Sequence, residues 1–253
     1  MRILLFVFIS IFLLLPDVNA QLLNVERIRM DPDTTGWNGD ISVDLSLNRL
    51  NDRVIRLNNT SNTSYQTEQH IYLLLTSLEL VSIDGNSLVS SGYVHLRSQF
   101  LRKKTFSPEL FFQHQYNENL GLKNRTLIGS GVRYSFLDRS RIVGNLFTGV
   151  MFEHEKWGLR TDEEVLRNLL KSTSTVSVTG QITPETRLLL IGYYQIRPEY
   201  PLEPRATLES ELLIRISRLF SLSVNYTMTY DTDPVIDIRG LTYELTNGLL
   251  IHF

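Results

Sequence analysis

The chain has 253 residues, no cysteine, and a nearly balanced set of 25 Lys and Arg against 27 Asp and Glu. The lack of cysteine excludes a disulfide framework and a Cys-based metal site, and the balanced charge argues against a nucleic-acid-binding surface. With 42% hydrophobic residues, the composition fits one β domain, including a transmembrane barrel in which polar lumen-facing residues offset apolar lipid-facing ones.

The amino terminus carries a predicted secretory signal peptide over residues 1–20. Arg2 precedes an apolar run that ends at Leu15, and small residues precede a cleavage site after Ala20. The run is shorter than the roughly 20 apolar residues of a membrane-spanning helix. We therefore expect an exported chain, with residues 21–36 as a periplasmic N-terminal extension and residues 37–253 as the β domain.

Alternation of apolar and polar residues predicts about twelve strands. In one of them Ile128 and Val132 alternate with Arg125 and Arg133. An Arg that faces lipid near the middle of a bilayer costs about 2–4 kcal/mol, so both Arg side chains are expected to face the lumen. The predicted strands span residues 37–48, 53–66, 70–80, 92–101, 109–118, 125–136, 142–155, 173–182, 187–197, 205–217, 220–230 and 240–253.

The connections between these strands alternate in length. Those after residues 66, 101, 136, 182 and 217 are short, and those around residues 84, 120, 160, 200 and 234 are longer. Short periplasmic turns and long outer loops are typical of outer-membrane barrels. In the longest loop, Thr161 and Glu164 form a predicted capping box before Val165, Leu166, Leu169 and Leu170, whose spacing predicts a helix.

The last predicted strand, residues 240–253, alternates over a length that suits a bilayer crossing better than a soluble sheet. Its ending, with Gly248, Ile251 and the terminal Phe253, resembles the C-terminal insertion signal of bacterial outer-membrane β-barrels. That resemblance implies recognition by the barrel assembly machinery. The alternative is an edge strand of a secreted soluble β protein.

Other landmarks follow one another along the mature chain: Gly36-Trp37-x-Gly39, Gly129-x-Gly131, Tyr193-Tyr194-Gln195 before a Pro, Tyr230-Asp231 with Pro234, and Phe253. Their order resembles a family of salt-induced outer-membrane proteins that carries a domain of unknown function. The chain departs from that family at Asn51-Asp52, where a Gly-Asn turn is usual. The resemblance implies an outer-membrane barrel and no defined activity.

The polar face of the predicted strands supplies the candidate functional residues. Charges of both signs lie on neighbouring strands, which indicates either an ion-paired network that fills a narrow lumen or a weakly selective pore. Outer-membrane lipid is an expected partner, and small solutes or ions are further candidates. The lumen-lining candidates are Glu109, Gln113, Gln115, Arg125, Arg133, Arg187, Glu209, Glu211 and Arg215.

No catalytic, cofactor-binding or metal site is predicted. The five His residues lack metal-ligand spacing, and the sequence holds no phosphate loop, nucleophile elbow or HExxH motif. One alternative remains, a lipid-acting barrel enzyme that uses His114 and Ser130 on the outward face. The sequence thus predicts an all-β, antiparallel transmembrane β-barrel of about 12 strands in a Gram-negative outer membrane, acting as a non-enzymatic pore or as a plugged structural or stress-related barrel.

Overall fold

A computed structural model describes residues 35–49, 53–83, 86–158, 163–217, 219–235 and 240–251. These residues form twelve β-strands and one short 3-10 helix, η2 (Glu118–Leu120). The strands are β1 (Gly36–Arg49), β2 (Arg53–Gln66), β3 (His70–Ile83), β4 (Asn86–Phe100), β5 (Phe106–Asn117), β6 (Leu122–Arg139), β7 (Ile142–Gly158), β8 (Glu164–Gln181), β9 (Thr186–Arg197), β10 (Tyr200–Arg215), β11 (Phe220–Asp231) and β12 (Leu241–Ile251).

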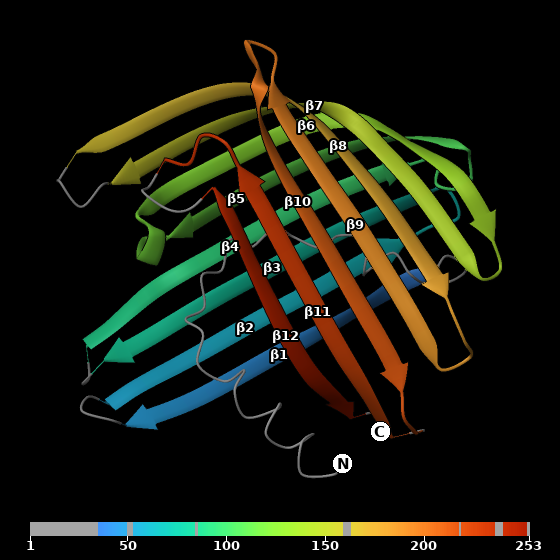
Figure 1. Ribbon diagram of the computed structural model, residues 1–253, viewed down its shortest axis with the longest axis horizontal. Helices are drawn as coiled ribbons and strands as arrows, with labels where there is room; N and C mark the ends of the chain where they lie inside the picture. Colours follow the sequence, from blue (N-terminus) through green and yellow to red (C-terminus); the bar gives the residue numbers. More distant parts are fainter. Residues whose placement is uncertain are drawn as a thin grey trace.

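The strands form one antiparallel sheet in sequence order, β1 to β12. Figure 1 shows the sheet curling so that β9–β12 pass across β1–β4. The strand number, the order and the curl are those of a β-barrel, and they confirm the predicted fold class. Among the residues that the structure describes, no backbone pairing joins β1 to β12. The described strands therefore form a curled sheet whose first and last strands are not hydrogen-bonded to each other.

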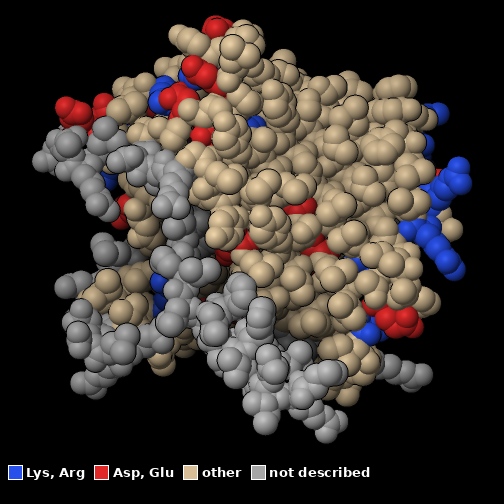
Figure 2. All heavy atoms as spheres, in the orientation of Figure 1, with Lys and Arg blue, Asp and Glu red and all other residues tan. Residues whose placement is uncertain are grey.

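The two faces of the sheet differ in exposure. On β6, Ile128 is 58% exposed, whereas Leu127 and Arg125 beside it are 7% and 8% exposed. Successive side chains of a strand point to opposite faces, so one face encloses an interior and the other carries the exposed apolar side chains. The view in Figure 2 has a broad surface that is largely free of charge, with Lys and Arg gathered near one edge.

The predicted helix is wrong. Residues from Glu164 onward belong to β8, which pairs with β7 from Gly158 opposite Glu164 to Phe152 opposite Leu170. The Leu-Leu doublet that favoured a helix also fits a strand, because it places one Leu on each face. Pairing with a long neighbour satisfies the backbone groups of residues 164–170 that face β7, and these hydrogen bonds outweigh a local capping signal worth about 1 kcal/mol.

The strands extend into several of the segments that were predicted to be long outer loops. The expected contrast between short and long connections is therefore wrong. β4 begins at Asn86 and β6 at Leu122, inside segments predicted to be loops. β10 begins at Tyr200, and its register against β9 shifts between Tyr200 and Arg205. The two prolines of β10 lie within this irregularity, where the missing N–H groups do not break the ladder.

Several predictions lie outside the described residues: the signal peptide and its cleavage site, most of the 21–36 extension, and the terminal Phe253. Gly36, assigned to that extension, is instead the first residue of β1, and Gly248 and Ile251 lie in β12. The polar segment 53–66 forms a full strand, β2, paired on both sides. Within the described chain, no helix has the length and apolar character needed to cross a membrane.

Candidate functional site

The nine predicted lumen-lining residues lie on the face that the curled sheet encloses. The alternation of more buried and more exposed positions along β5, β6, β9 and β10 assigns them to that face. Glu109, Gln113, Arg125, Arg133 and Glu209 are buried, Gln115, Arg187 and Glu211 are half-buried, and Arg215 is exposed at the end of β10.

One group of interior residues is built around Glu109, which is 1% exposed. Its carboxylate accepts a hydrogen bond from Arg97 on β4 at 3.0 Å and pairs with Arg133 on β6 at 3.9 Å. The Arg97 guanidinium lies over the rings of Phe111 and Phe147, 4.9 and 5.2 Å from their centroids. A cation over an aromatic face, with a carboxylate beside it, is a favourable way to bury an Arg.

The aromatic part of this group depends on glycines of β6. A Cβ atom added at Gly129 would lie 2.3 Å from Cζ of Phe111, and one added at Gly131 would lie 2.7 Å from Cζ of Phe147. The two rings meet edge to face with centroids 6.1 Å apart, and Met151 completes the apolar cluster. The glycines therefore make room for bulky apolar side chains inside the barrel.

A second group joins β6, β7 and β8. Arg125 pairs with Glu153 at 2.5 Å and with Glu155 at 3.1 Å. Lys171 on β8 pairs with the other oxygen of Glu153 at 2.6 Å. The Glu153 side chain is fully buried, and a buried charge is tolerated only when it is paired. Trp157 continues the group by donating from Nε1 to Glu155 at 3.0 Å.

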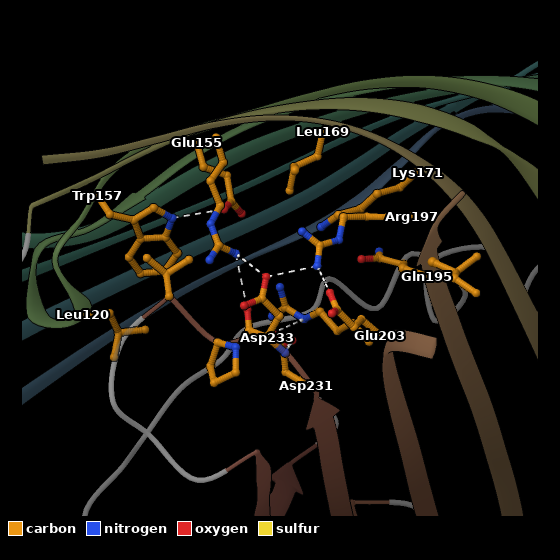
Figure 3. Close-up of a pocket in the computed structure, with 15 residues that line it drawn as sticks. Leu120, Glu155, Trp157, Leu169, Lys171, Gln195, Arg197, Glu203, Asp231 and Asp233 are labelled. Carbon is orange, nitrogen blue, oxygen red and sulfur yellow. Dashed lines mark hydrogen bonds and ion pairs between the residues drawn. The ribbon is translucent and has the colours of Figure 1, made fainter. Parts of the chain in front are cut away.

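A third group ties the connection after β11 to the wall of the barrel. Asp233 accepts hydrogen bonds from Arg167 of β8 at 3.0 Å and from Arg197 of β9 at 3.1 Å (Figure 3). Arg197 also pairs with Glu203 and lies over the ring of Tyr200, 4.7 Å from its centroid. Residues from three strands (β8, β9 and β10) and from the connection after β11 thus converge at one end of the interior.

Two adjoining cavities lie at the same end. Their volumes are about 450 and 110 Å³, and both are lined by Leu120, Trp157 and Arg205. Glu155 and Lys171 line the smaller cavity, so the second ion-paired group borders it directly. The interior thus combines a packed, charge-compensated middle with an open polar space at one end.

Sequence reasoning did not single out the ion-paired residues Glu155, Lys171 and Asp233, and it missed an apolar group inside the barrel, Phe111, Phe147 and Met151. These three apolar residues lie at positions where the alternation of apolar and polar residues along the strand predicts a polar side chain. The alternation therefore gives no reason to expect them in the interior. A signal was available, because Phe111 lies directly opposite Gly129 on the next strand. An aromatic side chain that covers a cross-strand glycine is a recurring sheet arrangement.

The alternative of a lipid-acting enzyme finds no geometric support. His114 lies opposite Thr126 and contacts its hydroxyl at 2.9 Å, whereas Ser130 lies opposite Leu110. Four residues of strand separate the two positions, which corresponds to roughly 13 Å. The described residues contain no group of three or more His, Cys, Asp or Glu placed to hold a metal ion.

The sequence profile of a family described as "Protein of unknown function, DUF481" matches residues 43–253. No curated protein matches the chain. Among solved structures, the NanC porin matches with a TM-score of 0.46 and 8% identity, over 86% of this chain and 98% of that one. The CymD monoaromatic hydrocarbon channel matches with a TM-score of 0.43 and 8% identity, over 83% and 75%. The β domain of the Bordetella autotransporter BrkA matches with a TM-score of 0.37 and 8% identity, over 86% and 98%.

Proposed function

Because the chain belongs to the DUF481 family, whose description assigns no activity, we propose its function from the surfaces of the barrel. The sequence analysis predicted a family of outer-membrane barrels that carries a domain of unknown function. The match to this family of unknown function confirms that prediction. The proposed function is that of a non-enzymatic outer-membrane β-barrel protein whose interior is closed by ion pairs and aromatic side chains. A salt-induced or other stress-related role remains a further proposal.

Residence in the outer membrane is supported by the outward face. Large apolar side chains are exposed on it along strand after strand, for example Ile41 and Val43 on β1, Val150 on β7 and Leu170 on β8. A water-soluble monomer rarely exposes so much contiguous apolar surface. The described strands run from 11 to 18 residues, long enough for a tilted bilayer crossing, which needs about 9–11. The predicted signal peptide and insertion signal agree with this location.

A closed interior is supported by the single observation that carries the proposal: the carboxylates of Glu109 and Glu153 in the middle of the interior are buried and paired. Glu109 and Glu153 have fully buried side chains, and each holds basic partners. An open aqueous pore keeps its charged side chains hydrated, whereas a dry interior requires such pairing. The Phe111 and Phe147 rings, packed with Met151, fill space beside the pairs.

Membrane residence is testable by expressing the full-length chain in a Gram-negative host. We expect the protein in the outer-membrane fraction, resistant to carbonate extraction, and with a faster gel mobility before boiling than after it. Phe253→Ser is expected to reduce the amount of assembled protein, because it alters the proposed insertion signal, while Phe106→Ser, at the exposed start of β5, serves as the matched control. A mature chain that stays soluble without detergent would instead establish the secreted β protein.

A further inference from the structure

The larger cavity has the dimensions of a ligand site. Its volume of about 450 Å³ lies within the range of roughly 300–1,000 Å³ that is typical of small-molecule sites. It is bounded by strands from opposite sides of the curled sheet, with Asn58 on β2, Tyr93 on β4, Gln115 on β5 and Arg205 on β10. The smaller cavity extends it beyond Trp157 and Arg205, which line both.

The charges around these cavities already have partners in the chain. In the larger cavity, Arg56 pairs with Glu79 at 3.1 Å and Arg125 with Glu155 at 3.1 Å. In the smaller one, Arg167 pairs with Asp233 at 3.0 Å. An ionic ligand would have to displace one of these internal partners and leave a charge without its counter-ion. The electrostatics therefore favour a ligand without net charge.

The uncharged part of the lining is polar and aromatic. Amide and hydroxyl groups come from Asn58, Ser77 and Gln115, and aromatic rings come from Tyr93 and Trp157. An apolar ligand would cover these amides and hydroxyls without replacing their hydrogen bonds to water, which disfavours it. A ligand that carries many hydroxyl groups and also C–H faces suits both parts of this lining.

Two buried atoms of the smaller cavity point to the same class of ligand. Oε1 of Gln195 and Nε of Arg205 have no hydrogen-bond partner among the described residues, although Nε of Arg205 lies 3.7 Å from Oδ2 of Asp231, an ion pair longer than a hydrogen bond. The two residues are cross-strand neighbours on β9 and β10. The amide oxygen accepts a hydrogen bond and the Nε–H donates one, and a hydroxyl group is the simplest partner that does both.

From these observations we infer that the connected cavities bind a neutral carbohydrate at the end of the barrel. This inference goes beyond the proposed function, because a barrel with a closed middle requires no ligand. The two are compatible, because a sugar bound at the end of the barrel would not pass through the closed middle. Gln195 and Arg205 would hold sugar hydroxyls in the smaller cavity. Asn58 and Gln115 would do so in the larger one, beside the rings of Tyr93 and Trp157.

The chain offers a built-in reporter for a test, because it has only two tryptophans. Trp37→Phe leaves Trp157 as the single emitter, and Trp157 lines both cavities. The refolded Trp37→Phe protein in lauryldimethylamine oxide, a detergent without a sugar headgroup, is titrated with maltose. Glucuronate, glucosamine and 1-hexanol serve as anionic, cationic and apolar probes. We expect a saturable change of Trp157 emission with maltose only.

Variants locate the binding. Asn58→Leu and Gln195→Leu, each checked for folding by gel mobility before boiling, are expected to weaken maltose binding about tenfold. Asn168→Leu, on the exposed face of β8, is expected to leave it unchanged. The absence of saturation by maltose, saturation by the charged or apolar probes instead, or a maltose affinity in both cavity variants equal to that of the Trp37→Phe parent would overturn the inference. Because the titration needs only a folded barrel in micelles, its outcome is independent of membrane location and of conductance.

Discussion

Glu153→Ala is expected to lower the free energy of unfolding by about 3–5 kcal/mol, the cost of removing one partner from a buried ion pair. The Glu153 carboxylate is fully buried and holds Arg125 with one oxygen and Lys171 with the other. Its loss leaves Lys171 without the ion pair observed for it and Arg125 with Glu155 alone. Within this group, the Glu155 carboxylate alone would then compensate the positive charges of Arg125 and Lys171.

The measurement is urea unfolding of the refolded protein from phospholipid vesicles, followed by tryptophan emission. The matched control is Glu164→Ala, because Glu164 also pairs with a lysine, Lys156 at 2.9 Å, but is 58% exposed. An exposed pair contributes about 0–1 kcal/mol. The double variant Glu153→Ala with Lys171→Met is expected to recover part of the loss. Equal effects of Glu153→Ala and Glu164→Ala would contradict a dry, ion-paired interior.

Ile128→Arg is the variant with the second largest expected effect, a loss of about 2–4 kcal/mol in vesicles, because it places a charge on the lipid face near the middle of a strand. Ile128 is 58% exposed, and its neighbours on β5 and β7 are Phe112 and Phe152, which are exposed as well. In a bilayer these three side chains contact hydrocarbon. In water they would form an unprotected apolar patch.

The control for Ile128→Arg is Asp138→Arg, at an exposed position near the end of the same strand. Near the interface an Arg costs about 0–1 kcal/mol. The same unfolding experiment in vesicles compares the two variants. If Ile128→Arg proved no more costly than Asp138→Arg, the outward face of β6 would not be a lipid-facing surface.

The sequence could predict which face of each strand points to the interior. That prediction needs only the alternation of side chains along a strand and one large energy difference, the cost of an Arg in lipid. Arg125 and Arg133 share a parity, and the cost of an Arg in lipid assigns that parity to the interior. The burial of both side chains, with Ile128 and Val132 exposed between them, agrees with this assignment. The energy gap between the two orientations is larger than any local propensity, so the sequence signal is strong.

The filling of the interior could not be predicted in the same way. Which side chain lies opposite which depends on the register, and one residue of shift exchanges every neighbour. The contact of Arg97 with Phe111 and Phe147 joins three strands, and nothing local in any of them indicates it. The helix prediction failed over residues 164–170 for a related reason, because pairing with the long partner strand β7 decided the structure of β8.

The closed interior is tested most directly by planar-bilayer conductance of the refolded mature protein. A closed interior predicts that the inserted, heat-modifiable protein shows no stable conductance steps. It also predicts that Phe111→Ala combined with Phe147→Ala, which removes the two rings beside Arg97, produces them. Stable steps in the unaltered protein, with an ion preference that shifts in Arg133→Glu or Glu209→Lys, would contradict the account and establish an open pore lined by charge.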